Sequence, residues 1–394
     1  MINSLKFEGA YRWSNYTSAG VTHTFKLGGD YEPVDDLRLR GTYQRAVRAP
    51  HVIELFSPRN VVLDGSQDPC AGLAASNPKV ARCASAFGLT TARVLAIEAN
   101  PANQYNGLTG GNPSLAPETS DTKSLGFILT PTAIPGFNFS ADWFDIKVKD
   151  YIDGIGADLI INRCVDTLDP FFCNLVRRDA AGSIWLSEGG YVIDTTLNTG
   201  ALRTRGIDFN AGYTTELDNL GIENGGSISA SFVGTYLASL KTQSLPGDAF
   251  YDCAGYYGTI CDVPNPEWRH KMRLTWNPSI GMGGVVDEFG ISLQWRYFAS
   301  VKLDALSADK GLTNPGLVSA TDAGKSAQSY FDLTATFTVM ERVKARIGVN
   351  NLLDRDPPLN GSSNCPTGPC NGNTWPQVYD ALGRYLFAGA TIDF

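Results

Sequence analysis

Long apolar runs are missing from this chain of 394 residues. A helix that crosses a membrane needs about 20 consecutive apolar residues, so the sequence excludes helical membrane spans. Charge is also scarce, because only 18% of the residues are charged and 40 acidic side chains outnumber 32 basic ones. An acidic chain lacks the basic surface that nucleic acids require, and we therefore expect no nucleic-acid partner.

The motifs of common enzymes and metal sites are absent as well. The sequence contains no Gly-x-Ser-x-Gly, no His-Glu-x-x-His and no Walker phosphate loop. Gly154-Ile155-Gly156 lacks a third glycine and a following helix, so we interpret it as a loop. The three histidines, His23, His51 and His270, lie on separate segments. We therefore expect no enzyme, no metal site and no cofactor.

The first residues, Met1 to Glu8, lack the basic, apolar and small-residue regions of a secretory signal. The protein is therefore either cytosolic or the remainder of a longer chain. Eight cysteines argue against the cytosol, because an even number in close pairs is typical of disulfides formed in an oxidising compartment. Metal binding is the alternative, which the lack of any Cys-x-x-Cys disfavours. The expected disulfides are Cys70–Cys83, Cys164–Cys173, Cys253–Cys261 and Cys365–Cys370.

Alternation of apolar and polar residues is the dominant pattern. In residues 5–13, apolar residues such as Phe7 occupy every second position and alternate with polar ones such as Glu8. Successive side chains of a strand point to opposite faces, so a strand with one apolar face and one solvent-exposed face shows this two-residue period. About twelve strands are predicted, at residues 5–13, 25–31, 37–44, 119–130, 136–152, 199–216, 227–240, 266–277, 289–302, 328–340, 342–351 and 383–394.

Short and long links alternate between these strands, except for a brief link near residues 15–19. The short links are 32–36, 131–135, 217–226, 278–288 and 340–342, and the long ones are 46–118, 153–198, 241–265, 303–327 and 352–382. Short turns at one rim and long loops at the other are typical of outer-membrane barrels. Counting back from a periplasmic C-terminus places all four cysteine pairs in extracellular loops.

Three features favour a membrane barrel over a soluble sandwich, whose strands also alternate. Several strands reach the about 9 to 11 residues that cross a bilayer at a tilt. Residues 386–394 alternate up to Phe394, an ending that resembles the insertion signal read by the outer-membrane barrel assembly machinery. Aromatic residues near strand ends suit the two interfacial girdles: Trp13, Tyr31, Trp143, Tyr236, Trp268, Trp276 and Trp295. We predict an all-β fold, a transmembrane antiparallel β-barrel in the bacterial outer membrane.

Six segments resemble the C-terminal barrel of the TonB-dependent outer-membrane receptors. They are RAVRAP at 45–50 with ELF at 54–56, GNPSLAPETS at 111–120, DWFDIKVKDYI at 142–152, GIDF at 206–209, NNLLDR at 350–355 and YDALGR at 379–384 with Phe394. In GIDF, Asp208 stands where the family pattern has Glu. Their order and spacing cover about residues 37–394. We interpret these segments as sites of strand entry and loop docking rather than of ligand contact.

The resemblance implies a 22-stranded barrel, an N-terminal plug and a short segment, the TonB box, that engages TonB. Residues 1–36 look like neither the plug nor that segment. We therefore expect residues 1–394 to be one C-terminal barrel portion, from a fragment or a truncated reading frame. The resemblance also implies TonB-ExbB-ExbD and outer-membrane lipid as partners. It implies uptake of a scarce small molecule or oligosaccharide: a ferric siderophore, haem, cobalamin or a sugar chain.

Residues for ligand contact are predicted at two places. Basic residues on the inward face could attract an anionic ferric chelate, although such charges commonly pair across a polar barrel wall. Aromatic residues beside cysteine pairs could line an outer vestibule. The predicted lumen or ligand contacts are Arg38, Arg40, Arg269, Lys271, Arg273, Arg296, Tyr256, Tyr257 and Trp375.

Two other functions remain open from the sequence. A complete twelve-stranded barrel could act as a passive pore or secretion translocator, which would conduct ions without TonB. A secreted all-β binding module would instead be soluble without detergent. A barrel lipase ranks last, because no nucleophile constellation is present.

Overall fold

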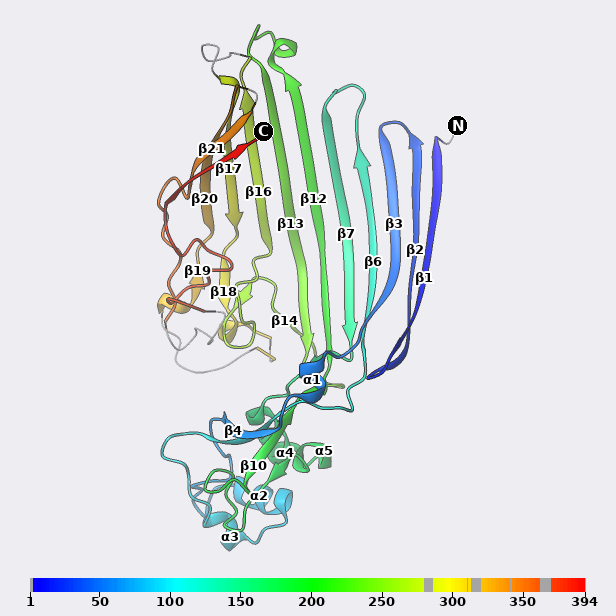
Figure 1. Cartoon of the computed structure of the whole chain (residues 1–394). Coiled ribbons are helices and arrows are strands. Elements are labelled where there is room, and N and C mark those ends of the chain that lie inside the picture. Colours follow the sequence, from blue (N-terminus) through cyan, green and yellow to red (C-terminus); the bar gives the residue numbers. More distant parts are fainter. Residues whose placement is uncertain are drawn as a thin grey trace.

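Twelve strands form one antiparallel sheet in the computed structural model, which describes residues 3–279, 286–309, 311–312, 320–340, 342–361 and 370–393 (Figure 1). Along the sheet they are β1 (Ser4–Tyr16), β2 (Gly20–Val34), β3 (Leu37–Arg48), β6 (Glu118–Leu129), β7 (Phe137–Lys149), β12 (Ala201–Glu216), β13 (Ser227–Gln243), β16 (Trp268–Asn277), β17 (Val286–Phe298), β20 (Gln328–Val339), β21 (Val343–Asn350) and β22 (Tyr385–Ile392). The two-residue β14 (Tyr251–Asp252) also pairs with β13. All twelve segments that alternation predicted are therefore strands of this sheet.

Cross-strand register separates the side chains into two faces. Leu39, Phe127, Ala141 and Phe209 are partners on β3, β6, β7 and β12 and form one apolar row. The next row on the opposite side contains Arg40, Gly126 and Asp142. Large apolar side chains remain exposed on the first side, with Phe7 82% and Leu125 64% exposed. We call these sides the apolar face and the polar face.

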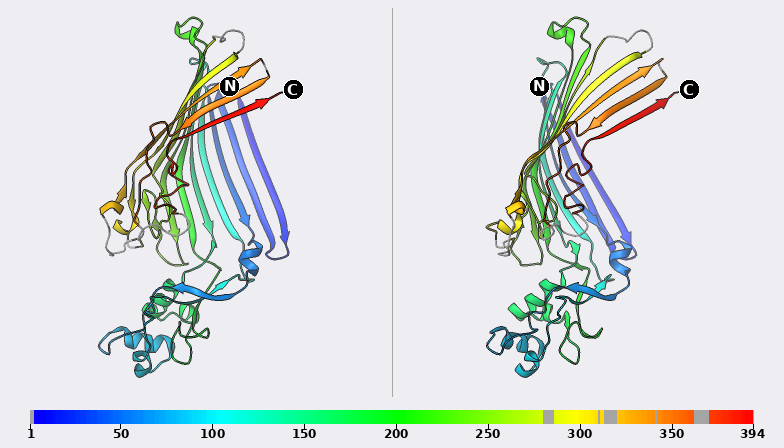
Figure 2. Two further views of the ribbon diagram at one scale, coloured as in Figure 1. Left: turned by 60° about the vertical axis from the view of Figure 1, so that its left-hand side comes forward. Right: turned by 90° about the vertical axis from the view of Figure 1, so that its left-hand side faces the viewer.

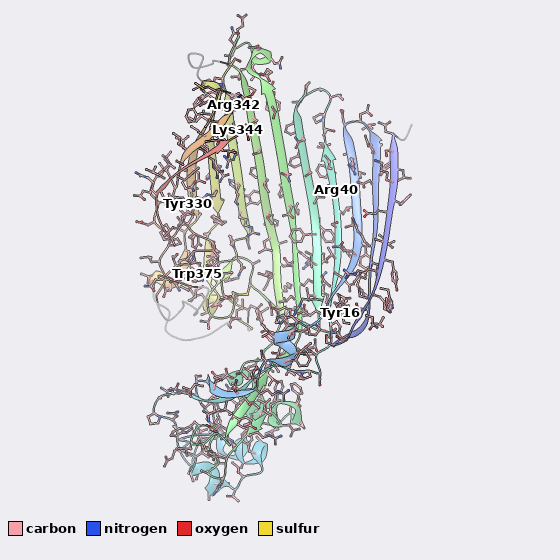
Figure 3. The ribbon with its side chains drawn as sticks, viewed as in Figure 1. Tyr16, Arg40, Tyr330, Arg342, Lys344 and Trp375 are labelled. Carbon is pink, nitrogen blue, oxygen red and sulfur yellow. A yellow bond between two sulfur atoms is a disulfide. The ribbon has the colours of Figure 1, made fainter. Side chains whose placement is uncertain are left out.

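The two ends of the sheet carry different connections. Short turns join the strands at one end, where Arg342 and Lys344 lie (Figure 3). The large irregular segments leave from the other end, toward which Tyr16 and Trp375 lie (Figure 3). We call these the short-turn end and the long-loop end.

The sheet does not close on itself within the part of the chain that the structure describes. β1 pairs there only with β2, and β22 pairs only with β21. Figure 1 shows these two edge strands on opposite sides of the view, and Figure 2 shows the curved sheet from two further directions. The described strands therefore form an open sheet, and the 22-stranded barrel that the family resemblance implies stays a prediction.

Two long loops fold together into a compact unit beneath the sheet, which we call the loop domain (residues 49–117 and 150–200; Figure 1). The first loop provides α1 (Val52–Phe56), β4 (Asn60–Gly65), α2 (Lys79–Phe87), α3 (Thr91–Leu95) and β5 (Tyr105–Gly110). The second provides β8 (Ile152–Asp153), α4 (Ala157–Thr167), α5 (Pro170–Cys173), β9 (Val176–Arg177), β10 (Tyr191–Thr195) and β11 (Leu197–Asn198). β5 pairs with β4 and with β10, so the two loops share one sheet. Ile160, Ile161, Ile184 and Val192 are fully buried at its core.

One detail of the sequence interpretation is wrong here. The glycine pair at residues 154–156 was expected to have no helix after it, but α4 begins directly at Ala157. The backbone N–H of Gly156 donates to Asp194 Oδ1 at 3.1 Å. The Asp194 carboxylate of β10 therefore accepts a hydrogen bond from a backbone N–H at the N-terminus of α4.

The remaining loops gather at the other side of the long-loop end. They contain β15 (Tyr256–Tyr257), β18 (Val301–Leu303) and β19 (Gly324–Lys325), which form a small sheet. Short 3-10 helices occur at Asp304–Leu306 and Ala320–Asp322, and another follows β12 at Leu217–Leu220. We call this group, made of the described parts of residues 244–267, 299–327 and 351–384, the C-terminal loop cluster.

Three of the four predicted disulfides are confirmed: Cys70–Cys83, Cys164–Cys173 and Cys253–Cys261. The fourth predicted pair includes Cys365, which lies outside the described residues, so it stays a prediction. Among the residues that the structure describes, no helix has the length and apolar character needed to span a membrane.

Replacing Cys70 and Cys83 together by serine should destabilise the loop domain. The disulfide joins residues 13 apart, and closing a loop of that size stabilises a fold by about 3 kcal/mol. Native-state proteolysis should show faster cleavage within residues 49–117. The matched variant C253S/C261S, in the C-terminal loop cluster, should leave that rate unchanged. Equal cleavage of the C70S/C83S variant and the parent would contradict this assignment.

Candidate functional site

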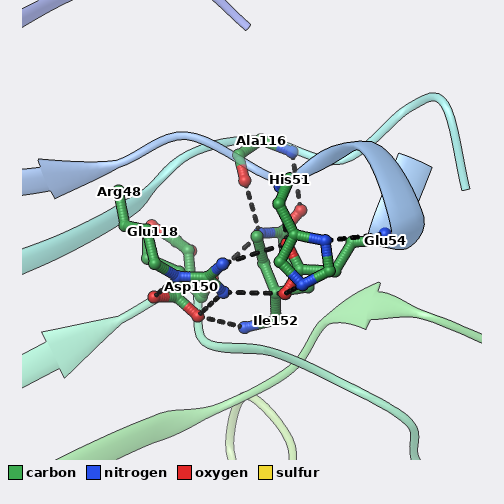
Figure 4. A network of polar contacts seen from close by, with 8 residues as sticks. Arg48, His51, Glu54, Ala116, Glu118, Asp150 and Ile152 are labelled. Carbon is green, nitrogen blue, oxygen red and sulfur yellow. Dashed lines mark hydrogen bonds and ion pairs between the residues drawn. The ribbon is translucent and has the colours of Figure 1, made fainter. Parts of the chain in front are cut away.

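Charged side chains bind the loop domain to the sheet where β3 ends and β6 begins (Figure 4). Arg48 donates to Glu118 through Nε at 2.6 Å and through Nη2 at 2.7 Å. The same guanidinium donates to both carboxylate oxygens of Glu54, each at 3.0 Å. The buried Glu118 also accepts from the backbone N–H of Ile152 at 2.8 Å. We call Arg48, Glu54, Glu118 and Ile152 the junction.

Two further side chains complete the junction's surroundings. His51 caps α1, because its Nδ1 accepts from the N–H of Glu54 at 3.2 Å, while the N–H of His51 donates to Glu54 at 2.9 Å. Asn198 exchanges two hydrogen bonds with the backbone of Ala116 and donates to the carbonyl of Asp150 at 2.8 Å. Three of the family-like segments, 45–56, 111–120 and 142–152, therefore meet here. This geometry agrees with their interpretation as strand entry and loop docking.

The predicted contacts Arg38 and Arg40 lie on the polar face and are paired with carboxylates. Arg40 donates to both oxygens of Asp142 at 2.7 and 2.6 Å, across the intervening Gly126. A Cβ on Gly126 would lie 2.0 Å from Asp142 Oδ1, so only glycine leaves room for this pair. Arg38 donates to Asp30 at 2.8 Å. The structure therefore shows Arg38 and Arg40 paired with carboxylates of neighbouring strands, which was the alternative to ligand contact.

Arg296 is held even more tightly. Its guanidinium donates to Asp332 of β20 at 2.8 Å and to Asp380 of the C-terminal loop cluster at 2.6 and 2.8 Å. Asp332 also accepts from the N–H of Asn351 at 2.9 Å. The Arg296 side chain is 17% exposed. Its donors are therefore occupied in anchoring a loop, and its contact with a ligand stays a prediction.

The basic residues Arg269, Lys271 and Arg273 share the polar face of β16, and Arg269 lies nearest the long-loop end. We call them the basic stripe. Arg273 donates to the neutral side chains of Ser292 and Gln294 at 2.9 and 2.6 Å. In the described parts of the chain, no carboxylate lies within 4.0 Å of the Arg269 or Lys271 side-chain nitrogens. The stripe therefore presents positive charge that the wall itself does not neutralise.

Two of the three aromatic residues predicted to line an outer vestibule are buried in this structure. Tyr257 and Trp375 are both 0% exposed. Their rings meet edge to face, with 5.2 Å between centroids, in a core that includes Leu303 and Tyr379. Packing of three separate loops buries these side chains, which a local sequence pattern does not reveal. Tyr256 is half-buried, and its ligand contact stays a prediction.

Two neighbouring carboxyl groups lie in the loop domain, where Asp64 is exposed and Asp194 is half-buried. Partial desolvation raises the pKa of Asp64, and the neighbouring Asp194 raises this pKa further. Burial also raises the pKa of Asp194, against the opposing effect of backbone N–H donors at the start of α4. Asp158 beside them accepts from Ser66 and Tyr105, with Tyr105 Oη at 2.7 Å. These groups belong to the packing of the domain, and sequence reasoning did not find them because they come from separate loops.

Comparison with known proteins identifies the architecture. Residues 2–352 match the family model described as "TonB dependent receptor-like, beta-barrel". The chain belongs to the TonB-dependent receptor family. This family consists of receptors and transporters rather than enzymes. A sequence search of curated proteins found no significant match.

Solved structures of TonB-dependent siderophore receptors share the fold. A variant of the ferric enterobactin receptor of Pseudomonas aeruginosa in complex with enterobactin is 14% identical, with a TM-score of 0.61, over 100% of this chain and 43% of that one. The siderophore receptor PirA of Acinetobacter baumannii is 15% identical, with a TM-score of 0.56, over 100% and 44%. The FrpB iron transporter of Neisseria meningitidis is 11% identical, with a TM-score of 0.53, over 100% and 44%. This chain therefore spans less than half the length of these receptors.

Replacing Glu118 by alanine should loosen the junction. The substitution leaves the Ile152 N–H without its acceptor, and a hydrogen bond to a charged group contributes about 1.5 to 3 kcal/mol. Hydrogen exchange at the Ile152 amide should therefore accelerate at least about tenfold. In the control Glu8→Ala, which removes an exposed ion pair with Lys26 on β1 and β2, this amide should exchange as in the parent. An unchanged rate in the Glu118 variant would refute the assigned role.

Replacing Asp64 by asparagine should stabilise the loop domain at neutral pH. A raised folded-state pKa means that the native state binds more protons than the unfolded chain, so stability falls as the pH rises above the ordinary aspartate value. The gain should therefore be largest near pH 7 and shrink as the pH approaches about 4. Proteolysis-based unfolding across this range measures it. A destabilised Asp64 variant at pH 7 would oppose the account.

Proposed function

We propose that this chain is the C-terminal barrel portion of an outer-membrane receptor that imports a scarce solute with energy supplied through TonB, ExbB and ExbD. The observation that carries the proposal is the family match over residues 2–352. The sheet supports it, because strands with one apolar and one polar face suit a wall between lipid and an aqueous lumen. The apolar face would contact outer-membrane lipid, and the polar face would line the lumen.

Further strands and a plug belong to this proposal. Unpaired strand edges cannot persist in hydrocarbon, because each unsatisfied N–H or C=O costs several kcal/mol. β1 and β22 would therefore pair with strands of the same receptor outside residues 1–394. An N-terminal plug would fill the lumen and contact TonB, and the barrel assembly machinery would recognise the ending at Phe394.

The solute would be an anionic ferric chelate of the siderophore class. The basic stripe supports this class, because its cations lie on the polar face and, among the described residues, no carboxylate pairs with Arg269 or Lys271. Positive charge inside a narrow lumen concentrates anions. Ligand binding in this family is non-covalent, so the chain would act as a carrier wall and not as an enzyme. Haem, cobalamin and oligosaccharides are the other solutes that the test should separate.

Uptake of radiolabelled ferric siderophore by whole cells tests the proposal, using the native polypeptide that contains this chain. Uptake should require TonB, and the variant R269Q/K271Q should reduce uptake of an anionic ferric chelate at least about threefold. The matched variant K6Q/K344Q removes two lysines from the polar face near the short-turn end. That control should transport as the parent does.

Three outcomes would contradict the proposal. Uptake that continues without TonB, together with ion conductance in planar bilayers, would favour a passive pore. Recovery of the protein in soluble fractions without detergent would favour a secreted binding module. Equal loss in both double variants would show that the basic stripe has no special role in binding the solute.

A further inference from the structure

On β3, β6, β7, β12 and β13, the side chains of the apolar face change from apolar to charged toward the long-loop end. One cross-strand row is apolar throughout: Gly41, Leu125, Trp143, Ile207 and Tyr236. The next row on the same face is Tyr43, Lys123, Asp145, Arg205 and Ser239. The row after it is Arg45, Asp121, Lys147, Arg203 and Lys241. We call these two charged rows, with Lys149, the outer patch.

Positive charge dominates the outer patch. It contains seven cations, Arg45, Lys123, Lys147, Lys149, Arg203, Arg205 and Lys241, against the two carboxylates Asp121 and Asp145. This excess is the opposite of the whole chain, whose net charge is -8. The same rows continue on β2 as Leu27 and Phe25, which are apolar. The charge is therefore concentrated on five neighbouring strands.

The two carboxylates are already engaged. Asp121 accepts from Arg45 at 2.7 and 3.0 Å and from Lys149 at 3.4 Å. Asp145 accepts from Arg203 at 2.8 and 2.5 Å. Throughout the described residues, Lys123, Lys147, Arg205 and Lys241 form no ion pair within 4.0 Å. Arg205 donates to the neutral Ser239 at 3.3 Å, so these four cations are available to an anionic ligand.

The outer patch is also hollowed. A depression of about 310 Å³ is lined by Tyr43, Asp121, Lys123, Asp145, Lys147 and Arg203. Guanidinium and ammonium groups around such a hollow suit phosphate oxygens, which accept several charge-assisted hydrogen bonds at once. Tyr43 Oη lies 3.4 Å from Asp121 and adds a hydroxyl beside the hollow.

We propose that the outer patch binds the phosphate groups of an anionic lipid of the outer leaflet. The apolar rows directly below supply a surface for the acyl chains of the same molecule. On β7, apolar outward residues begin at Phe137 and the first charge is Asp145, about 26 Å farther along the strand at 3.3 Å per residue. Because barrel strands are tilted by about 40°, this distance corresponds to roughly 20 Å across the membrane, which is most of an apolar band about 25 Å tall. The charges thus lie where lipid headgroups begin, on the side of the wall away from the basic stripe.

Native mass spectrometry of the native polypeptide, purified in detergent, tests this lipid site. The probes are a diglucosamine lipid with two phosphates, the same lipid without phosphate, and phosphatidylcholine. The doubly phosphorylated lipid should remain bound, and the variant K123Q/K147Q should weaken its binding at least about tenfold, equivalent to about 1.4 kcal/mol. The matched variant K6Q/K344Q removes two lysines from the polar face and should bind this lipid as the parent does.

Several results would overturn the proposal. Equal retention of the phosphorylated and phosphate-free lipids would show that acyl chains alone determine binding. Displacement of the lipid by inorganic phosphate at low millimolar concentration would indicate a small-anion site. An unchanged affinity in K123Q/K147Q would remove the outer patch from the binding surface. Because siderophore uptake does not enter the measurement, the lipid site and the proposed transport function are tested separately.

Discussion

Successive side chains of a strand point to opposite faces, and in this sheet the two faces require different surroundings. The cross-strand rows through Phe127 and through Asp142 are one residue apart on each strand, yet one is apolar and the other is charged. A shift of register by one residue would exchange the faces. The register of all twelve strands, the exposure of large apolar side chains and the position of the loops depend on this constraint. Membership of the TonB-dependent receptor family supports the proposal that this sheet is a wall between lipid and water.

Guanidinium–carboxylate pairs fix the parts that alternation leaves undetermined. Arg40 and Asp142 join β3 to β7 across Gly126. Arg48 attaches the loop domain through Glu118, and Arg296 attaches the C-terminal loop cluster through Asp380. Each arginine offers two parallel donors, so each pair sets orientation as well as proximity. Basic side chains that are not paired in this way remain in the basic stripe on one face and in the outer patch on the other. These unpaired charges are available for ligands.

Local patterns predicted the strands and three disulfides, because period-two alternation and short cysteine spacings are properties of neighbouring residues. The helices of the loop domain were not predicted, and the first turn of α4 depends on a hydrogen bond to Asp194, which comes from a strand far away in sequence. The burial of Trp375 was missed for the same reason, because loops far apart in sequence cover it. The outer patch left a signal that could have been used: Asp145, Lys147 and Lys149 occupy the positions of β7 that alternation assigns to the apolar face.

Spin labels placed one at a time at residues 269–274 of β16, in outer-membrane vesicles, test the central claim most directly. Oxygen dissolved in lipid and a water-soluble nickel chelate would each be used to measure how accessible every label is. The account predicts that labels at 270, 272 and 274 are reached by oxygen and those at 269, 271 and 273 by the nickel chelate. Equal access of the nickel chelate to all six positions would contradict a wall between lipid and water.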